Sequence, residues 1–170
     1  ITGTTANLGG GTLTNAGLLS AGAQDTVETV NVGGNLVQTA DGQLAMNINF
    51  GSTPSDKFIV SGNSNLGGEL LVSLDQLAAT NAPIVLVQTG AGAAVSGITV
   101  EDLPVLDYAI SVSGKNIVLT ATPHFDSVVA AGSNEAAIGR SFNAILSAGE
   151  PSGLDPLFLA LANMTNPAAV

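Results

Sequence analysis

Two imperfect copies of one pattern lie within residues 29–74, which read TVNVGGNLVQTADGQLAMNINFGSTPSDKFIVSGNSNLGGELLVSL. In each copy a valine-containing segment leads through a glycine-containing turn into a run of alternating apolar residues. Val60 repeats Val32, and Leu70 repeats Leu44 at nearly the same interval along the chain. Self-similarity on this scale is typical of solenoids, in which each copy buries its apolar face only by stacking on its neighbour. The sequence therefore predicts a stack of β-coils.

The strands of this stack are indicated by the spacing of apolar residues. Residues 44–50 and 70–74 alternate apolar with small or polar side chains, which is the pattern of a strand with one buried face. Residues 83–87 form a continuous apolar run, which predicts a strand buried on both faces. Residues 108–120 hold two more apolar segments on either side of a Gly-Lys-Asn turn, and we expect them to form a β-hairpin.

Two short helices are predicted after residue 122. Ser133 and Asn134 can cap a first helix, and Gly149 can end it. Asp155 followed by Pro156 predicts the N-cap and first turn of a second helix. Helical spacing of apolar residues gives the following expected packing positions: Ile138, Phe142, Ile145 and Leu146 in the first helix, and Leu157, Leu161 and Met164 in the second, which should end before Pro167.

These patterns divide the chain into three segments. Residues 1–82 are expected to form the β-helical repeat coils. Residues 83–122 depart from the repeat, and we expect them to form a C-terminal cap. Residues 123–170 are expected to form a helical linker region. A cap is physically required because the end of a parallel solenoid exposes unpaired N–H and C=O groups.

The composition restricts the class of partner. Hydrophobic residues make up 45% of the 170 residues, but aromatic residues only 4%, so the core should be built from small aliphatic side chains. Thirteen acidic residues face three basic ones, and the net charge is −10. Binding to nucleic acid needs clustered basic side chains that replace counterions on phosphate, so the charge argues against that function. The same charge argues against docking on anionic lipid.

The chain contains no cysteine, so its fold does not depend on disulfides. Its first residues contain no basic and apolar segments of a signal peptide and no initiator methionine, and we expect the sequence to be a fragment of a longer protein. No uninterrupted apolar run approaches the roughly 20 residues of a membrane-spanning helix.

Several segments, in this order, resemble the C-terminal part of a bacterial autotransporter passenger. Residues 11–18 are similar to the coil pattern G-x-L-x-N-x-G of that family. Residues 56–72 resemble its D-x-L-x-V-x-G and L-G-G-x-L-x-V pair. Residues 108–120 resemble its closing Y-x-L-x-V-x-G-x-x-L-x-L-T strand pair. The tail around residues 134–137 and 159–163 is similar to the helical segment that leads to the outer-membrane barrel.

The resemblance implies an all-β fold, namely a right-handed parallel β-helix with a β-hairpin cap and short C-terminal helices. It also implies an autochaperone that folds first and templates the coils behind it. The expected partners are the chain's own upstream β-helix and its own C-terminal outer-membrane barrel, which is absent from this sequence. The resemblance also implies a secreted protein that stays at the surface of a Gram-negative cell, associated with the outer membrane. Such a protein could have a host or cell-surface ligand, whose identity the sequence does not indicate.

The residues expected to matter are structural. Those expected to stack inside the coils are Leu66, Leu70, Val72 and Leu74, and those expected to close the cap are Tyr108, Ile110, Val112, Ile117 and Leu119. We expect a non-enzymatic folding and display module without cofactor or metal. The alternatives are a surface-recognition module that binds protein or glycan along the solenoid, a β-helix hydrolase or lyase, and self-association through exposed edges.

Few residues offer chemistry. His124 is the only histidine, and a dyad with Asp126 and Ser127 is one interpretation, but we interpret it as a polar linker residue. Glu101, Asp102 and Asp107 form the densest acidic cluster and have the oxygen ligands that Ca²⁺ prefers. No calcium-binding nonapeptide or EF-hand pattern accompanies them, so we interpret them as a solvated loop. The glycine pairs are interpreted as turns rather than phosphate loops.

Overall fold

The computed structural model describes residues 4–22, 26–51, 53–127, 130–149 and 153–164. The chain forms a β-solenoid of about three turns followed by a hairpin and two helices. This confirms the predicted fold class. In chain order the elements are β1 (Thr5–Asn15), β2 (Leu18–Ser20), β3 (Thr29–Gln38), β4 (Gln43–Phe50), β5 (Lys57–Val60), β6 (Ser64–Leu66), β7 (Glu69–Leu77), β8 (Ile84–Thr89), β9 (Ala93–Val95), β10 (Thr99–Val100), β11 (Leu106–Ser113), β12 (Asn116–Pro123), α1 (Asn134–Ala148) and α2 (Asp155–Ala162).

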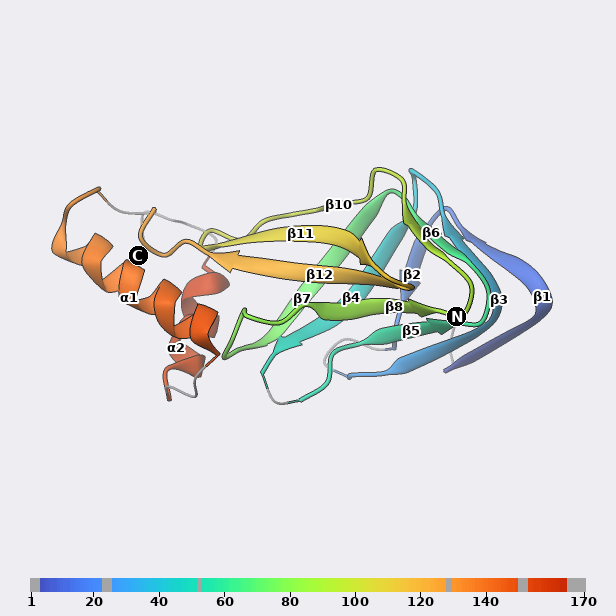
Figure 1. Cartoon of the computed structure of the whole chain (residues 1–170), viewed down its shortest axis with the longest axis horizontal. Coiled ribbons are helices and arrows are strands. Elements are labelled where there is room, and N and C mark those ends of the chain that lie inside the picture. The colour runs from blue at the N-terminus through green and yellow to red at the C-terminus, as the bar shows by residue number, and fades with distance from the viewer. Residues whose placement is uncertain (1–3, 23–25, 52, 128–129, 150–152, 165–170) are drawn as a thin grey trace.

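The solenoid has three faces. The first face holds β1, β3, β5, β8, β12 and β11 in that order, and the second holds β1, β3, β6 and β9. The third face is a separate sheet in the order β2, β4, β7 and β10. The long strands β1 and β3 bend between the first two faces (Figure 1). Residues 29–32 of β3 pair with β5, and residues 36–38 pair with β6.

The sequence repeat is the hydrogen-bonding register of the stack. Val32 lies opposite Val60, and Leu44 lies opposite Leu70, both in parallel pairs. The interval that separates the two copies in the sequence is therefore the length of chain from one turn to the next. One-residue register shifts would move the apolar side chains to the outer surface, so the buried face fixes this register.

The repeat continues beyond residue 82, where the sequence pattern places the end of the coils. β8, β9 and β10 pair in parallel with β5, β6 and β7, so one further pass of each face extends to Val100. The sequence repeat is faint here because Thr89 lies opposite Val60, and Ala93 and Ala94 lie opposite the polar residues Ser64 and Asn65. Parallel backbone pairing does not require matching side chains, so the predicted cap region begins with a coil.

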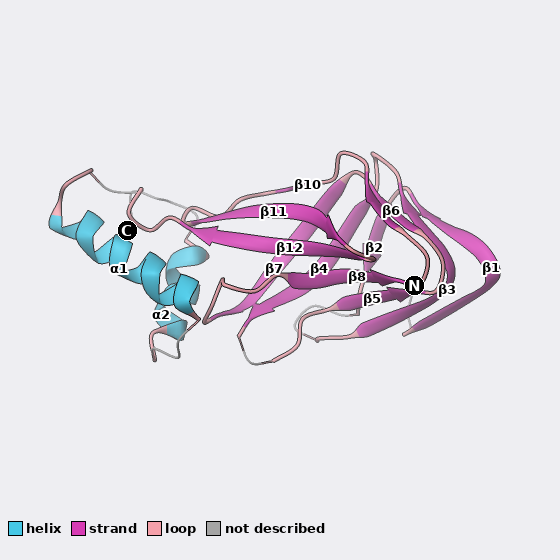
Figure 2. Ribbon diagram, in the orientation of Figure 1, coloured by secondary structure: helices cyan, strands magenta, loops and turns pink. Residues whose placement is uncertain are grey.

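The two helices lie at the end of the solenoid away from β1 (Figure 2). Ser133 caps α1 as predicted, since its Oγ accepts a hydrogen bond from the Ala136 N–H at 3.1 Å, and Gly149 ends the helix with φ 72°. Phe125, Phe142 and Phe158 form an aromatic cluster with ring centroids 5.3–5.8 Å apart. This cluster joins the end of β12 to both helices.

Some predicted helix details are wrong. Ile138 is 54% exposed because α1 packs through the side that carries Ala136, Gly139 and Leu146, where Gly139 allows the helix to lie against the Asp126 backbone. The N-cap of α2 is Leu154, and Asp155 is the first helical residue. α2 buries Phe158 and Ala162 instead of Leu157, which is 42% exposed. Pro167, the expected limit of α2, lies outside the described residues.

Candidate functional site: the two ends of the solenoid

The interior of the solenoid contains all four residues predicted for it, in different degrees of burial. Leu66 and Leu70 are fully buried, and Leu74 is 8% exposed. Leu70 lies between Leu44 of the preceding turn and Val100 of the following one. Val72 is half-buried against the core, because β10 ends at Val100 and no strand of the next pass in the described chain covers it.

The C-terminal end of the solenoid is closed by the hairpin of β11 and β12. β12 pairs antiparallel with β8, which ends the parallel stacking of the first face. Ile117, Leu119 and Tyr108 are buried, and Ile110 is half-buried against the core. On the first face the antiparallel hairpin thus takes the place of a further parallel coil, and β11 is its outermost strand in the described part of the chain.

Val112 does not contribute to this closure. Its side chain is 42% exposed, whereas Tyr108, on the same side of β11, is 8% exposed. Burial decreases along β11 toward the turn at Gly114, since β11 is the outermost strand of its sheet and its inner face extends past the core there. The alternation of apolar residues identified the face, but not the point where the face leaves the core.

The N-terminal end of the solenoid is open. β1 pairs only with β3, and β2 pairs only with β4, so neither strand has a partner on its outer edge among the described residues. Leu8 and Leu13 are only partly buried although both pack on the core. Leu13 lies opposite the fully buried Leu36. The open end therefore offers both an unpaired strand edge and an uncovered apolar surface.

Asp56 joins two consecutive turns, a role that the sequence analysis did not assign. It is 1% exposed, and its carboxylate accepts hydrogen bonds from the Glu28 N–H at 2.6 Å and the Asn47 N–H at 2.7 Å. Burial raises the pKa of Asp56, and the charges of Asp75 and Glu28 act in the same direction against these two hydrogen bonds. Asp56 is the first residue of the segment 56–72, whose pattern resembles a passenger coil. The aspartate at the start of that pattern was the sequence signal from which its role could have been found.

A polar ladder crosses the corner between the second and third faces. Asn15 Nδ2 donates to Gln38 Oε1 at 3.1 Å and to the Gln43 carbonyl at 3.0 Å. Gln38 Nε2 in turn donates to the Gly67 carbonyl at 2.7 Å. Each amide thus reaches toward the turn that follows it, and the buried polar groups are satisfied between turns.

His124 has a different acidic partner from the one considered in the sequence. Its Nε2 lies 3.1 Å from Asp107 Oδ1, whereas Asp126 accepts a hydrogen bond from Asn143 Nδ2 at 2.6 Å. His124 Nδ1 lies 2.8 Å from Ser127 Oγ, and that hydroxyl donates to the His124 carbonyl at 2.8 Å. The ring of His124 therefore contacts Ser127 through Nδ1 and Asp107 through Nε2, and Asp126 takes no part in this contact.

The acidic cluster is divided between two tasks. Asp102 Oδ1 accepts a hydrogen bond from the Tyr108 N–H at 2.6 Å, and Asp107 faces His124. Among the described residues, no group of three or more His, Cys, Asp or Glu side chains is gathered in a way that could hold a metal ion. Asp102 therefore holds the backbone of β11, and Asp107 faces the His124 side chain. The carboxylates of the cluster are not gathered around one point.

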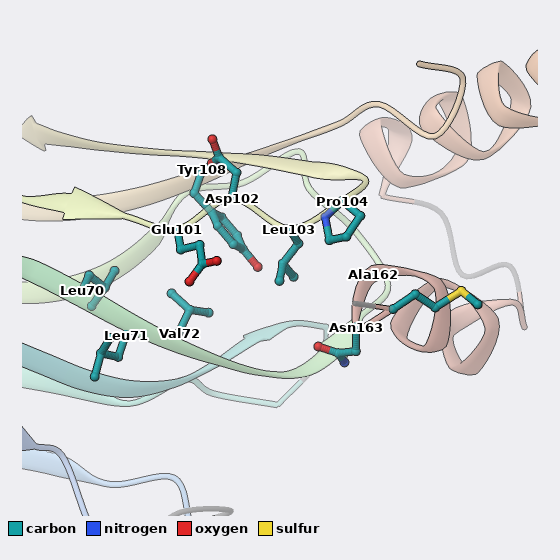
Figure 3. A pocket seen from close by; sticks show the side chains of 11 residues that line it. Leu70, Leu71, Val72, Glu101, Asp102, Leu103, Pro104, Tyr108, Ala162 and Asn163 are labelled. Atoms are coloured by element: carbon teal, nitrogen blue, oxygen red, sulfur yellow. The ribbon is translucent and has the colours of Figure 1, made fainter. Parts of the chain in front are cut away.

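A pocket of about 620 Å³ lies beside the closed end, between β7, the loop of residues 101–104 and the end of α2 (Figure 3). Leu70, Leu71 and Val72 line one side of it, and Leu103, Pro104 and Ala162 line the other. Tyr108 enters it from the hairpin.

No helix in the described part of the chain combines the length and apolar character needed to cross a membrane.

The fold and these two ends define the chain as a capped parallel β-solenoid. Comparison with known proteins adds no name to this class: no protein-family model, no curated protein and no solved structure matches the chain.

Proposed function

We propose that this chain is a non-enzymatic structural and folding module, the C-terminal passenger segment of a bacterial autotransporter. In this role it nucleates the folding of the β-helix that precedes it and displays the upstream passenger at the surface of a Gram-negative cell. The difference between the two ends of the solenoid is the observation that carries the proposal.

A module that templates upstream coils needs one closed end and one receptive end. The hairpin ends the parallel coils of the first face beyond β8, whereas β1 and β2 keep the parallel register and have no partner on their outer edges in the described residues. Leu8 and Leu13 are partly buried and present apolar surface at the open N-terminal end of the solenoid. In a repeat protein, stability is close to a sum of unit and interface terms, so a stable terminal unit stabilises every turn that stacks on it.

Recognition of a ligand along the solenoid receives less support. Aromatic side chains supply many of the dominant contacts in protein interfaces. All six aromatic residues of the chain lie in the described part; five are buried, and Phe142 is half-buried in the helical cluster. Adhesive contacts would then have to come from other side chains, so the folding role is the proposal we retain.

The genetic context tests the autotransporter assignment. Sequencing the gene past the codon for Val170 should reveal, over about 250 residues, alternating strands of about ten residues with aromatic girdles, which is the pattern of an outer-membrane barrel. A stop codon soon after that position would overturn the assignment, because no barrel would then follow.

A refolding assay tests the templating role itself. The β-helical segment encoded directly upstream should refold faster when joined to this chain than alone. Leu13→Asp places a charge on the open end and should remove the acceleration, because a stacked coil would bury that charge. Leu18→Asp is the matched control, since Leu18 is 63% exposed. Equal acceleration by both variants would contradict templating through this end.

A further inference from the structure

The third face ends unevenly at its C-terminal side. β10 pairs with β7 only at Thr99 opposite Glu69 and Val100 opposite Leu70. β7 continues to Leu77, with β4 on its other side over its full length. Beyond Leu70, no strand of the described residues pairs with this edge of β7, and the strand is in contact with α2. A strand edge without a paired neighbour is a template for an added strand.

The pocket of about 620 Å³ lies along this free edge. Val72 points toward the core opposite Met46, yet it is only half-buried, because the next pass of the solenoid, as far as the structure describes it, supplies no residue above it. Leu103, Pro104 and Ala162 complete an apolar wall. The site therefore lacks an aliphatic side chain at the position where a longer β10 would have placed one.

Tyr108 supplies a polar group inside this apolar site. The residue is 8% exposed, and its hydroxyl has no hydrogen-bond partner among the described residues. Figure 3 shows its ring entering the pocket between Glu101 and Leu103. Leaving a buried hydroxyl unsatisfied is unfavourable, and a carbonyl oxygen of a bound strand would accept a hydrogen bond from it. The backbone of Tyr108 is fixed by Asp102 through the 2.6 Å hydrogen bond to its N–H.

The charge of the pocket indicates the chemistry of its occupant. Glu101 and Asp102 are exposed at its margin, and none of the chain's three basic residues lines it. With a net charge of −10, the whole chain favours a basic partner near these carboxylates.

We propose that this pocket binds an extended peptide segment of a partner protein that carries aliphatic and basic residues. The segment adds a strand to β7 beyond the end of β10 and places an aliphatic side chain over Val72. One of its backbone carbonyls accepts a hydrogen bond from the Tyr108 hydroxyl, and a lysine or arginine faces Glu101 and Asp102. This inference stands apart from the folding role, because it concerns a side of the closed end that no upstream coil reaches.

Fluorescence anisotropy with the whole chain tests the proposal. The probe is a labelled eight-residue peptide of alternating valine and lysine. It should bind at micromolar to millimolar concentration, and the matched valine and glutamate peptide should not. Tyr108→Phe should weaken binding by about threefold to tenfold, which corresponds to one hydrogen bond. Glu101→Gln should weaken it and reduce its salt dependence, while Asp41→Asn, at an exposed acid that does not line the pocket, should leave it unchanged.

Val72→Phe fills the pocket and should abolish binding. Circular dichroism and the unfolding midpoint establish whether this variant is folded. If it is not, the smaller Val72→Ile is used, and it should weaken binding without abolishing it. Equal binding of both peptides, or unchanged binding to Val72→Phe, would overturn the proposal. So would dimerisation that Val72→Phe abolishes without any peptide binding, because the occupant would then be a second copy of this chain.

Discussion

Phe50 and Tyr108 stack on each other, with ring centroids 6.4 Å apart and ring planes inclined by 14°. Phe50 is the last residue of β4, and Tyr108 lies much later in the chain, in the capping hairpin. Phe50 lies opposite Leu77 of β7, so β4 is one turn earlier in the solenoid than β7. The contact of Tyr108 with Phe50 therefore reaches past β7 to this earlier turn. The hairpin is thus anchored inside the solenoid and does not only rest on its last turn.

Removal of the Tyr108 ring should detach the cap. We expect Tyr108→Ala to lower the free energy of unfolding by about 3–5 kcal/mol, as for other buried aromatic residues. Tyr108→Phe keeps the stacked ring and removes a hydroxyl that has no partner in the described residues, so it should change stability by less than about 1 kcal/mol. Urea unfolding followed by circular dichroism measures both. Equal losses in the two variants would show that the stacked ring is not the anchor.

Charges placed along the predicted structural residues should have graded effects. Leu70→Asp buries an unpaired charge between Leu44 and Val100 and should prevent folding and, in the proposed passenger, surface display. Ile110→Asp, at a half-buried position, should reduce both. Val112→Asp is the matched control on the same strand and should be tolerated. Normal folding of the Leu70 variant would contradict the interior stack.

Asp56 should be necessary as a hydrogen-bond acceptor between turns. Asp56→Ala leaves the N–H groups of Glu28 and Asn47 without their acceptor, and each unsatisfied buried donor costs about 1–3 kcal/mol. Asp56→Asn retains one acceptor oxygen and should lose less. The free energies of unfolding of the two variants, compared at one pH, measure the difference. An alanine variant as stable as the wild type would mean that water replaces both bonds.

The same carboxyl should make stability depend on pH. Burial raises the pKa of Asp56 above its ordinary value of 3.8. The folded state therefore binds this proton more tightly than the unfolded state, and the resulting stabilisation is complete below pH 3.8 and lost as pH rises through the raised pKa. The difference in unfolding free energy between the wild type and Asp56→Asn should thus grow in favour of the wild type on acidification from neutral pH. A difference that shrinks on acidification would contradict the direction.

Gly68 should resist substitution for two separable reasons. Its φ is 68°, and a Cβ there would collide with the Gly42 carbonyl of the preceding turn. The left-handed conformation alone costs an L residue about 1–2 kcal/mol. Gly114→Ala isolates that conformational cost, because φ is 61° with open space around it, and Gly17→Ala should be neutral. Thermal unfolding should rank Gly68→Ala as the most destabilising of the three, and equal effects of the Gly68 and Gly114 variants would exclude the collision.

The parts of the fold that follow from side-chain periodicity could be predicted from the sequence. The correspondence of Val32 with Val60 predicted the register, and Ser133 and Gly149 predicted the limits of α1. The coil that ends at Val100 was missed, because backbone pairing holds alanine and glycine in the ladder without a matching side-chain pattern. Which side of a helix faces the core depends on a distant contact, such as that of Gly139 with Asp126, and no local pattern contains it.

The candidate site shows the same division. Leu66 and Leu70 were identified by alternation, and the antiparallel cap was identified by its two apolar segments. The partnership of His124 with Asp107 and the approach of Tyr108 to Phe50 were not foreseen, because they join residues that the topology brings together. The uncovered edge of β7 depends on where β10 stops, and so short a strand leaves little trace in the sequence.

In the proposed folding role, the C-terminal end of the solenoid orders first and templates the turns before it. Pulsed hydrogen exchange during refolding measures this order strand by strand. We expect amides of β7, β8 and β12 to become protected before those of β1 and β3. Protection of β1 and β3 first, or protection of all strands with one time constant, would contradict it.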